Sequence, residues 1–85
     1  MTLDEQFTKA QGDVKTLKQR PSNETLLELY ALYKQGTEGD ASGSRPGMFD
    51  LVGRAKFDAW AKSKGTAKDA AKTAYVALVE RLLGR

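Results

Sequence analysis

The sequence predicts an all-α fold of four helices, and three observations carry that prediction. Apolar residues recur at spacings of three and four in four separate segments, which is the period of an amphipathic helix. Capping residues precede these segments, and no segment alternates apolar and polar residues as a strand would. The 85 residues, of which 40% are hydrophobic and 29% charged, suit one small globular domain covering residues 1–85.

The first predicted helix covers residues 3–17. Thr2 and Glu5 have the spacing of a capping box at its start. Pro21 disfavours a helical residue before it and therefore ends the segment. Its apolar residues share one face and are Leu3, Phe7, Ala10, Val14 and Leu17.

The second predicted helix begins at Ser22 or Asn23, either of which can cap it, and continues to about residue 34. Gly36 is its expected C-terminal signal. Tyr30 belongs to two adjoining apolar stripes, so the apolar face is wide. Such a helix is expected to contact more than one neighbour, or one neighbour and a ligand.

Residues 36–50 form the one long irregular stretch, and it is rich in glycine. Fully extended, a stretch of this length spans up to about 50 Å, whereas a helix of four turns is about 20 Å long. The third helix can therefore start at the far end of the second and run parallel to it. Short connections elsewhere make the other neighbours antiparallel.

The third predicted helix covers residues 51–64, with Asp50 as its N-cap and Gly65 as its C-terminal signal. The fourth opens with Thr66 and Asp69, which have the spacing of a second capping box. Small and apolar residues then recur at helical spacing in the fourth helix, and they are Ala67, Ala71, Ala74, Tyr75, Leu78 and Leu82.

The composition excludes several classes of function. The chain has no cysteine and no histidine, so it has no disulfide, no thiolate and no histidine general base or zinc ligand. We therefore expect no enzyme, no metal and no cofactor. No apolar run approaches the about 20 residues that span a bilayer, and the N-terminus is unlike a signal peptide, which predicts a cytoplasmic protein without stable membrane insertion.

The charge balance favours an anionic partner without indicating nucleic acid. The chain has 14 basic and 11 acidic residues, which gives a net charge of +3. This excess is too small and too dispersed for a nucleic-acid interface.

Aromatic and basic side chains gather in the second helix. Tyr30, Tyr33 and Lys34 share one part of its surface, and Lys56 and Tyr75 come from the third and fourth helices. If the helices meet, two ammonium groups and three phenols converge on one site that suits a phosphorylated aromatic ligand. The alternative is that the tyrosines are core residues and the lysines are solvated, and spacing leaves both open.

The order of several motifs resembles the acyl-CoA-binding protein family. These motifs are LYALYKQGTEGD at residues 29–40, RPGMFDLVGRAKFDAW at 45–60 and KGTAKDAAKTAYVALVERL at 64–82. The N-terminal part FTKAQGDVKTLKQRPSNETLLELY, residues 7–30, also fits, so the resemblance covers nearly the whole chain. Each motif is weak alone, and the combination is highly specific.

The resemblance implies a four-helix up-down-down-up bundle with a long connection between the second and third helices. It also implies a monomeric, non-catalytic carrier that binds medium- to long-chain fatty acyl-CoA. In the family, the residue at Tyr33 stacks on the adenine. The residues at Lys34 and Lys56 contact the phosphate on the 3′ carbon of the ribose, helped by the phenol at Tyr30.

The resemblance assigns four further residues to the ligand. Tyr75 corresponds to a tyrosine against the nucleotide, and Lys15 to a lysine that borders the site. Leu27 and Ala55 are placed along the acyl groove between the second and third helices.

Three residues depart from the family pattern, so affinity and preferred chain length stay open. Val52 stands where many members have a lysine, and helix geometry turns the nearby Arg54 to another side. Phe57 replaces a commoner tryptophan, and Gln11 replaces a small residue beside the adenine. The rival interpretation is a helical module whose aromatic face docks a partner helix or peptide.

Overall fold

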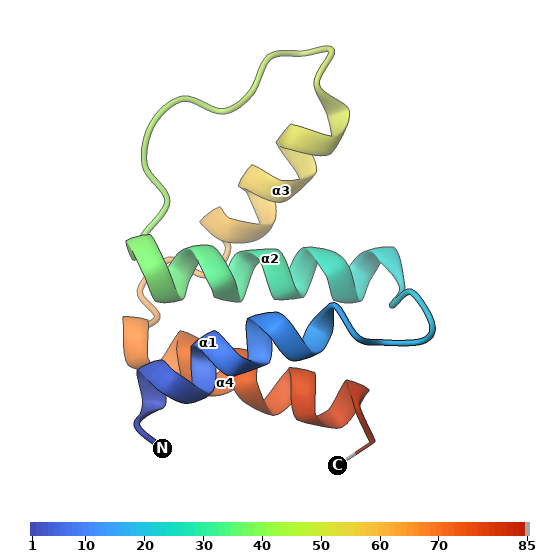
Figure 1. Cartoon of the computed structure of the whole chain (residues 1–85). Coiled ribbons are helices and arrows are strands. Elements are labelled where there is room, and N and C mark those ends of the chain that lie inside the picture. The colour runs from blue at the N-terminus through green and yellow to red at the C-terminus, as the bar shows by residue number, and fades with distance from the viewer. Residues whose placement is uncertain (85) are drawn as a thin grey trace.

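The computed structural model describes residues 1–84, and these residues form four α-helices without strands, which confirms the predicted all-α class. The helices are α1 (Leu3–Val14), α2 (Asn23–Glu38), α3 (Leu51–Ala61) and α4 (Lys68–Leu82). Figure 1 shows α1 and α4 running in one direction and α2 and α3 in the other, with α3 inclined to α2. The helix α2 packs on both α3 and α4, and α1 packs on α4. The arrangement is the expected up-down-down-up order.

Three predicted N-caps form. The Glu5 amide donates to Thr2 Oγ1 at 3.1 Å and the Thr2 amide donates to Glu5 Oε1 at 3.0 Å, which closes the capping box. The Thr2 amide, followed by the Thr2 side chain, holds the pKa of the Glu5 carboxyl below its usual value. Ser22 caps α2 and Asp50 caps α3, each accepting a bond from the amide three residues later.

Two helices end earlier than the apolar spacing predicts. The helix α1 ends at Val14, because the amides of residues 15–17 bond to carbonyls three residues back instead of four. The helix α3 ends at Ala61, and the amides of residues 63–64 do the same. The predicted last turns at residues 15–17 and 62–64 are therefore tight turns, and the stripe of apolar residues does not distinguish them from α-helix.

The prediction that α2 ends near Gly36 is wrong. The helix continues to Glu38 and ends at Gly39, whose positive φ of +82° is a conformation that glycine adopts without strain. Gly36 is buried inside the helix, and a Cβ there would lie 3.1 Å from Lys72 Cγ and 3.4 Å from the Phe7 ring. Glycine at this position allows close packing of α2 against its neighbours.

The predicted capping box at Thr66 and Asp69 is also wrong. The N-cap of α4 is Ala67, which makes no side-chain capping bond. The Thr66 carbonyl instead accepts a hydrogen bond of 2.8 Å from Gln35 Nε2 in α2. Thr66 therefore takes part in a tertiary hydrogen bond through its backbone carbonyl, and its side chain does not form the predicted cap of α4.

A buried amide joins the end of α2 to the turn before α4. Gln35 is fully buried, and its Nε2 donates to Asp40 Oδ1 at 2.9 Å as well as to Thr66. The Gly65 amide donates to the same Asp40 oxygen at 2.9 Å. Nearby, Trp60 Nε1 donates to the Gly39 carbonyl at 2.8 Å. These bonds fix where α2 ends and hold α3 against it.

The hydrophobic core lies between α1, α2 and α4. It includes an edge-to-face contact between Phe7 and Tyr75, whose ring centroids are 5.1 Å apart. The buried residues of this cluster are Phe7, Ala10, Leu29, Tyr75, Leu78 and Val79.

The long connection between α2 and α3 crosses back along the molecule, as its length predicts (Figure 1). Two arginines tie it to α3. Arg45 makes a bidentate pair with Asp58, with distances of 2.9 and 2.8 Å. Arg54 Nε lies 3.0 Å from the carbonyl oxygens of Pro46 and Gly47. The connection sets where α3 begins and which of its faces meets α2.

Candidate functional site

The ammonium groups of α2 and α3 lie over aromatic rings of the opposite helix. Lys56 Nζ, from α3, is 5.4 Å from the centroid of the Tyr30 ring in α2. Lys34 Nζ, from α2, is 4.8 Å from the Trp60 ring in α3. Both are within the range of cation–π attraction. The structure therefore brings Lys56 of α3 to Tyr30 of α2, which lies four residues before Lys34. We call Tyr30, Tyr33, Lys34 and Lys56 the lysine–tyrosine cluster.

The tyrosines of the site differ in exposure. Tyr33 is 38% exposed. Its ring stacks against the ring of Phe7, with the two centroids 6.1 Å apart and the ring planes inclined by 28°. It therefore has a surface available for stacking. Tyr75 is only 5% exposed, and this burial raises the pKa of its phenol. Tyr75 thus belongs to the core, as the alternative interpretation expected, and its ligand contact stays a prediction.

Lys34 is held as a cation by a carboxylate in its own helix. Its ammonium forms a salt bridge with Glu38, four residues later. The bond to Glu38 raises the pKa of Lys34, and the nearby Tyr30 and Tyr33 add to the shift. The Lys34 side chain is only 21% exposed, so it keeps a defined position between Glu38 and Trp60.

Two residues that the resemblance placed beside the ligand, Lys15 and Gln11, lie after α1 and on α1. Lys15 is exposed and follows the last residue of α1, and its contact with a ligand stays a prediction. Gln11 is half-buried on α1.

The other departures from the family pattern lie on α3. Phe57 makes an edge-to-face contact with Trp60, with centroids 6.2 Å apart, so it supports the ring under Lys34. Val52 is 67% exposed. Arg54 does not replace a lysine at position 52, since its guanidinium bonds to carbonyls of the preceding loop.

Two hollows lie along the packing of α2 against α3, and Leu27 and Ala55 line both of them. The first, the lysine-side hollow, has a volume of about 400 Å³ and shares Lys56 with the lysine–tyrosine cluster. It is lined by Arg20, Asn23, Leu26, Leu27, Leu51, Val52, Ala55 and Lys56.

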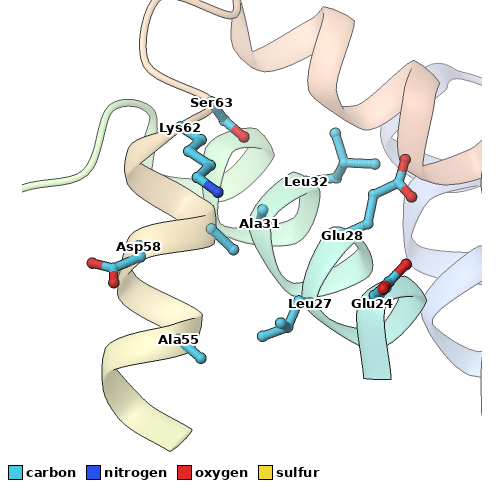
Figure 2. Close-up of a pocket in the computed structure, with 10 residues that line it drawn as sticks. Glu24, Leu27, Glu28, Ala31, Leu32, Ala55, Asp58, Lys62 and Ser63 are labelled. Atoms are coloured by element: carbon cyan, nitrogen blue, oxygen red, sulfur yellow. The ribbon is translucent and has the colours of Figure 1, made fainter. Parts of the chain in front are cut away.

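The second, the acidic hollow, has a volume of about 590 Å³ and lies between α2 and α3 (Figure 2). Glu24 and Glu28 line it from α2, and Lys62 lines it from the residue after α3. Asp58 also lines it, but Figure 2 shows its carboxylate pointing away from α2. The other residues that line it are Leu27, Ala31, Leu32, Ala55, Ala59 and Ser63. The sequence did not predict this second hollow.

The charges distinguish the two hollows. The lysine-side hollow carries Arg20 and Lys56 and no carboxylate. The acidic hollow carries Glu24, Glu28 and Lys62, together with Asp58, whose charge is already paired with Arg45. The charges of the lysine-side hollow therefore suit an anionic molecule with an apolar tail better than those of the acidic hollow.

Within residues 1–84, no group of three or more His, Cys, Asp or Glu side chains is placed to hold a metal ion. None of the helices within residues 1–84 is both long enough and apolar enough to cross a membrane.

Further residues belong to the site beyond those that the family motifs indicate. Glu38 pairs with Lys34, and its position four residues later is the spacing of a helical ion pair, which the sequence could have shown. Trp60 is buried and also lies against the Lys34 ammonium. Leu51 lines the lysine-side hollow, and no local sequence pattern indicates this, because residues of both α2 and α3 line that hollow.

Comparison with known proteins gives a consistent result. The family model described as Acyl CoA binding protein matches residues 4–79. The acyl-CoA-binding protein homolog 1 of Caenorhabditis elegans is 59% identical over 85 residues, covering 100% of this chain and 96% of the relative. The acyl-CoA-binding protein homolog of Manduca sexta is 54% identical, covering 98% and 93%.

Solved structures agree with the sequence relatives. The crystal structure of Oryza sativa acyl-CoA-binding protein 2 superposes with a TM-score of 0.93 at 42% identity, covering 98% of this chain and 92% of that one. The solution structure of the yeast acyl coenzyme A binding protein gives 0.71 at 43% identity, covering 98% and 93%. The fold and the site thus define a small helical binding protein with a cationic, aromatic cluster beside an apolar hollow. The chain belongs to the acyl-CoA-binding protein family.

Proposed function

We propose that this protein binds medium- to long-chain fatty acyl-CoA thioesters non-covalently and acts as an intracellular carrier that forms and delivers an acyl-CoA pool. The observation that carries the proposal is the position of the lysine-side hollow. It shares Lys56 with the lysine–tyrosine cluster, so a site for anionic phosphate lies directly beside a groove for an apolar chain.

The ligand has two chemically different parts, and each has a counterpart in the protein. The nucleotide head is polyanionic, and Lys34 and Lys56 offer two ammonium groups for the 3′-phosphate. Tyr30, whose ring lies under the Lys56 ammonium, is assigned a supporting contact through its hydroxyl. The exposed ring of Tyr33 offers a surface for the adenine. Tyr75 and Lys15 are proposed as further contacts of the nucleotide.

The acyl tail is assigned to the lysine-side hollow, along Leu27 and Ala55. Burial of each CH₂ group contributes about 0.8 kcal/mol, so affinity increases with chain length until the hollow is filled. The acidic hollow is also bordered by Leu27 and Ala55, and its carboxylates disfavour an anionic ligand. The charge difference supports placing the tail in the lysine-side hollow.

The remaining features of the proposal concern how the carrier works. Residues 1–85 act as one acyl-CoA-binding domain and as a monomer, in the cytoplasm, where a chain without disulfides meets a reducing environment. Acyl-CoA is the ligand, and no cofactor, metal or nucleic acid is required. The protein does not hydrolyse the thioester, because binding alone accounts for every residue of the site.

Isothermal titration calorimetry with palmitoyl-CoA, CoA and palmitate tests the proposal. We expect saturable, submicromolar to micromolar binding of palmitoyl-CoA, weaker binding of CoA and little binding of palmitate. Absence of saturable palmitoyl-CoA binding would show that the proposal is wrong. Thioester hydrolysis that survives repurification and is abolished by a point mutation would contradict the non-catalytic role.

A further inference from the structure

Glu38 is paired with the ammonium group of Lys34, which the proposed function assigns to the phosphate of the ligand. It lies in the last turn of α2 and forms a salt bridge with Lys34. Its side chain is 51% exposed, whereas that of Lys34 is 21% exposed. The carboxylate can therefore turn towards solvent, while the lysine stays in place.

We propose that Glu38 is a displaceable counter-ion that competes with the ligand's phosphate for Lys34 and lowers the affinity for the phosphorylated head. The inference rests on the proposed function and adds to it a residue that tunes ligand release. A phosphate that approaches Lys34 must replace the carboxylate or share the ammonium with it. In both cases the ligand gains less than it would from an unpaired lysine.

Two further features of the site support this competition. The Trp60 ring contacts the Lys34 ammonium at 4.8 Å from another direction, so the lysine keeps its position when the carboxylate leaves. Lys34 also lies in the last turns of α2, where the carbonyl ends of the helix dipole disfavour an anion. Glu38 adds a full negative charge to that end of the helix, and it lies close to the proposed phosphate position.

As a consequence, the affinity of the carrier for the nucleotide head is lower than it would be if Lys34 and Lys56 had no counter-ion. Because a carrier must also deliver its ligand, weaker binding that appears mainly as faster dissociation suits this function. Glu38 lowers the affinity only for a ligand whose 3′-phosphate competes for Lys34. A ligand without the 3′-phosphate should therefore bind equally well with or without the Glu38 charge.

The test compares Glu38→Gln with wild type by calorimetry at low ionic strength, using palmitoyl-CoA and 3′-dephospho-palmitoyl-CoA. We expect Glu38→Gln to bind palmitoyl-CoA about two- to fivefold more tightly, a range set by the modest strength of exposed helical ion pairs plus the repulsion removed. Binding of the dephospho ligand is expected to stay unchanged. Stopped-flow displacement should show slower dissociation of palmitoyl-CoA from the variant.

Glu24→Gln is the matched control, because it removes the same charge from an exposed residue of the same helix at the acidic hollow. It is expected to leave both affinities unchanged. A double-mutant cycle with Lys34→Met isolates the coupling, since the gain from Glu38→Gln should shrink when the ammonium is absent.

The outcomes separate this inference from the proposed function. If wild type binds palmitoyl-CoA and Glu38→Gln binds it no more tightly, the competition is refuted and the carrier function stands. Equal gains in Glu38→Gln and Glu24→Gln would also refute it, because net charge would then explain both. If wild type shows no saturable binding, the proposed function fails and this inference fails with it.

Discussion

Replacing Leu51 by serine tests which hollow holds the acyl tail. Leu51 lines the lysine-side hollow and is 75% exposed in the free protein. Because its side chain contributes little to the core, the substitution should change the free energy of unfolding by less than about 0.5 kcal/mol. Its effect on binding can therefore be measured on a folded protein.

The expected loss follows from the apolar area that the ligand would cover. Complete burial of a leucine side chain is worth about 1.5–3 kcal/mol, and the hollow is open on one side, so we expect about 1 kcal/mol. This corresponds to roughly fivefold weaker binding of palmitoyl-CoA. Free CoA, which has no acyl chain, should bind Leu51→Ser and wild type equally.

The assay is calorimetry with CoA, octanoyl-CoA and palmitoyl-CoA on three proteins: wild type, Leu51→Ser and Ala59→Ser. Ala59 lines only the acidic hollow, so Ala59→Ser is the control and should retain full affinity. If Ala59→Ser weakens palmitoyl-CoA and Leu51→Ser does not, the tail lies in the acidic hollow and the charge argument is wrong. An equal loss for CoA and palmitoyl-CoA in Leu51→Ser would show that the residue acts on the head or the fold.

Three other predictions concern the head site, a helix cap and pH. Tyr33→Ala should weaken CoA and palmitoyl-CoA by the same factor, about tenfold, since base stacking is worth about 1–3 kcal/mol; unchanged calorimetric binding would remove the stacking role. Thr2→Ala should lower the free energy of unfolding in urea by about 1 kcal/mol through loss of the capping box, and no change would mean that the cap is unimportant. The Gly65 amide, with Gln35, lowers the pKa of Asp40, so its stabilisation is complete above the unfolded pKa of about 4 and is lost as pH falls through the folded pKa. The stability gap between wild type and Asp40→Asn should therefore narrow below about pH 4, and a constant gap in thermal melts would contradict this.

Local patterns predicted the elements of the fold well. Periodic apolar residues located all four helices, and the capping residues Thr2, Ser22 and Asp50 marked the starts of three of them. These signals depend on neighbours within one or two turns, so they can be read along the chain. The length of residues 36–50 also predicted the parallel course of α3 along α2, because chain reach is a local property.

Boundaries that depend on distant contacts were predicted poorly. Gly36 resembles a helix end and is instead a place where α2 packs closely against Lys72 and Phe7. Thr66 resembles a cap and instead accepts a bond from Gln35, 31 residues away. In both cases a tertiary contact, which local sequence does not reveal, determined the structure.

The same division applies to the site. From the sequence alone, the family motifs predicted an acyl-CoA-binding protein and proposed which residues form its head site. Only the tertiary structure decided that Lys56 lies over Tyr30, that Tyr75 is buried, that Lys34 is paired with Glu38, and that two hollows of opposite charge lie beside Leu27. Residue identity determines which chemistry is available, whereas the packing of α2 against α3 determines which groups meet and how far water reaches them.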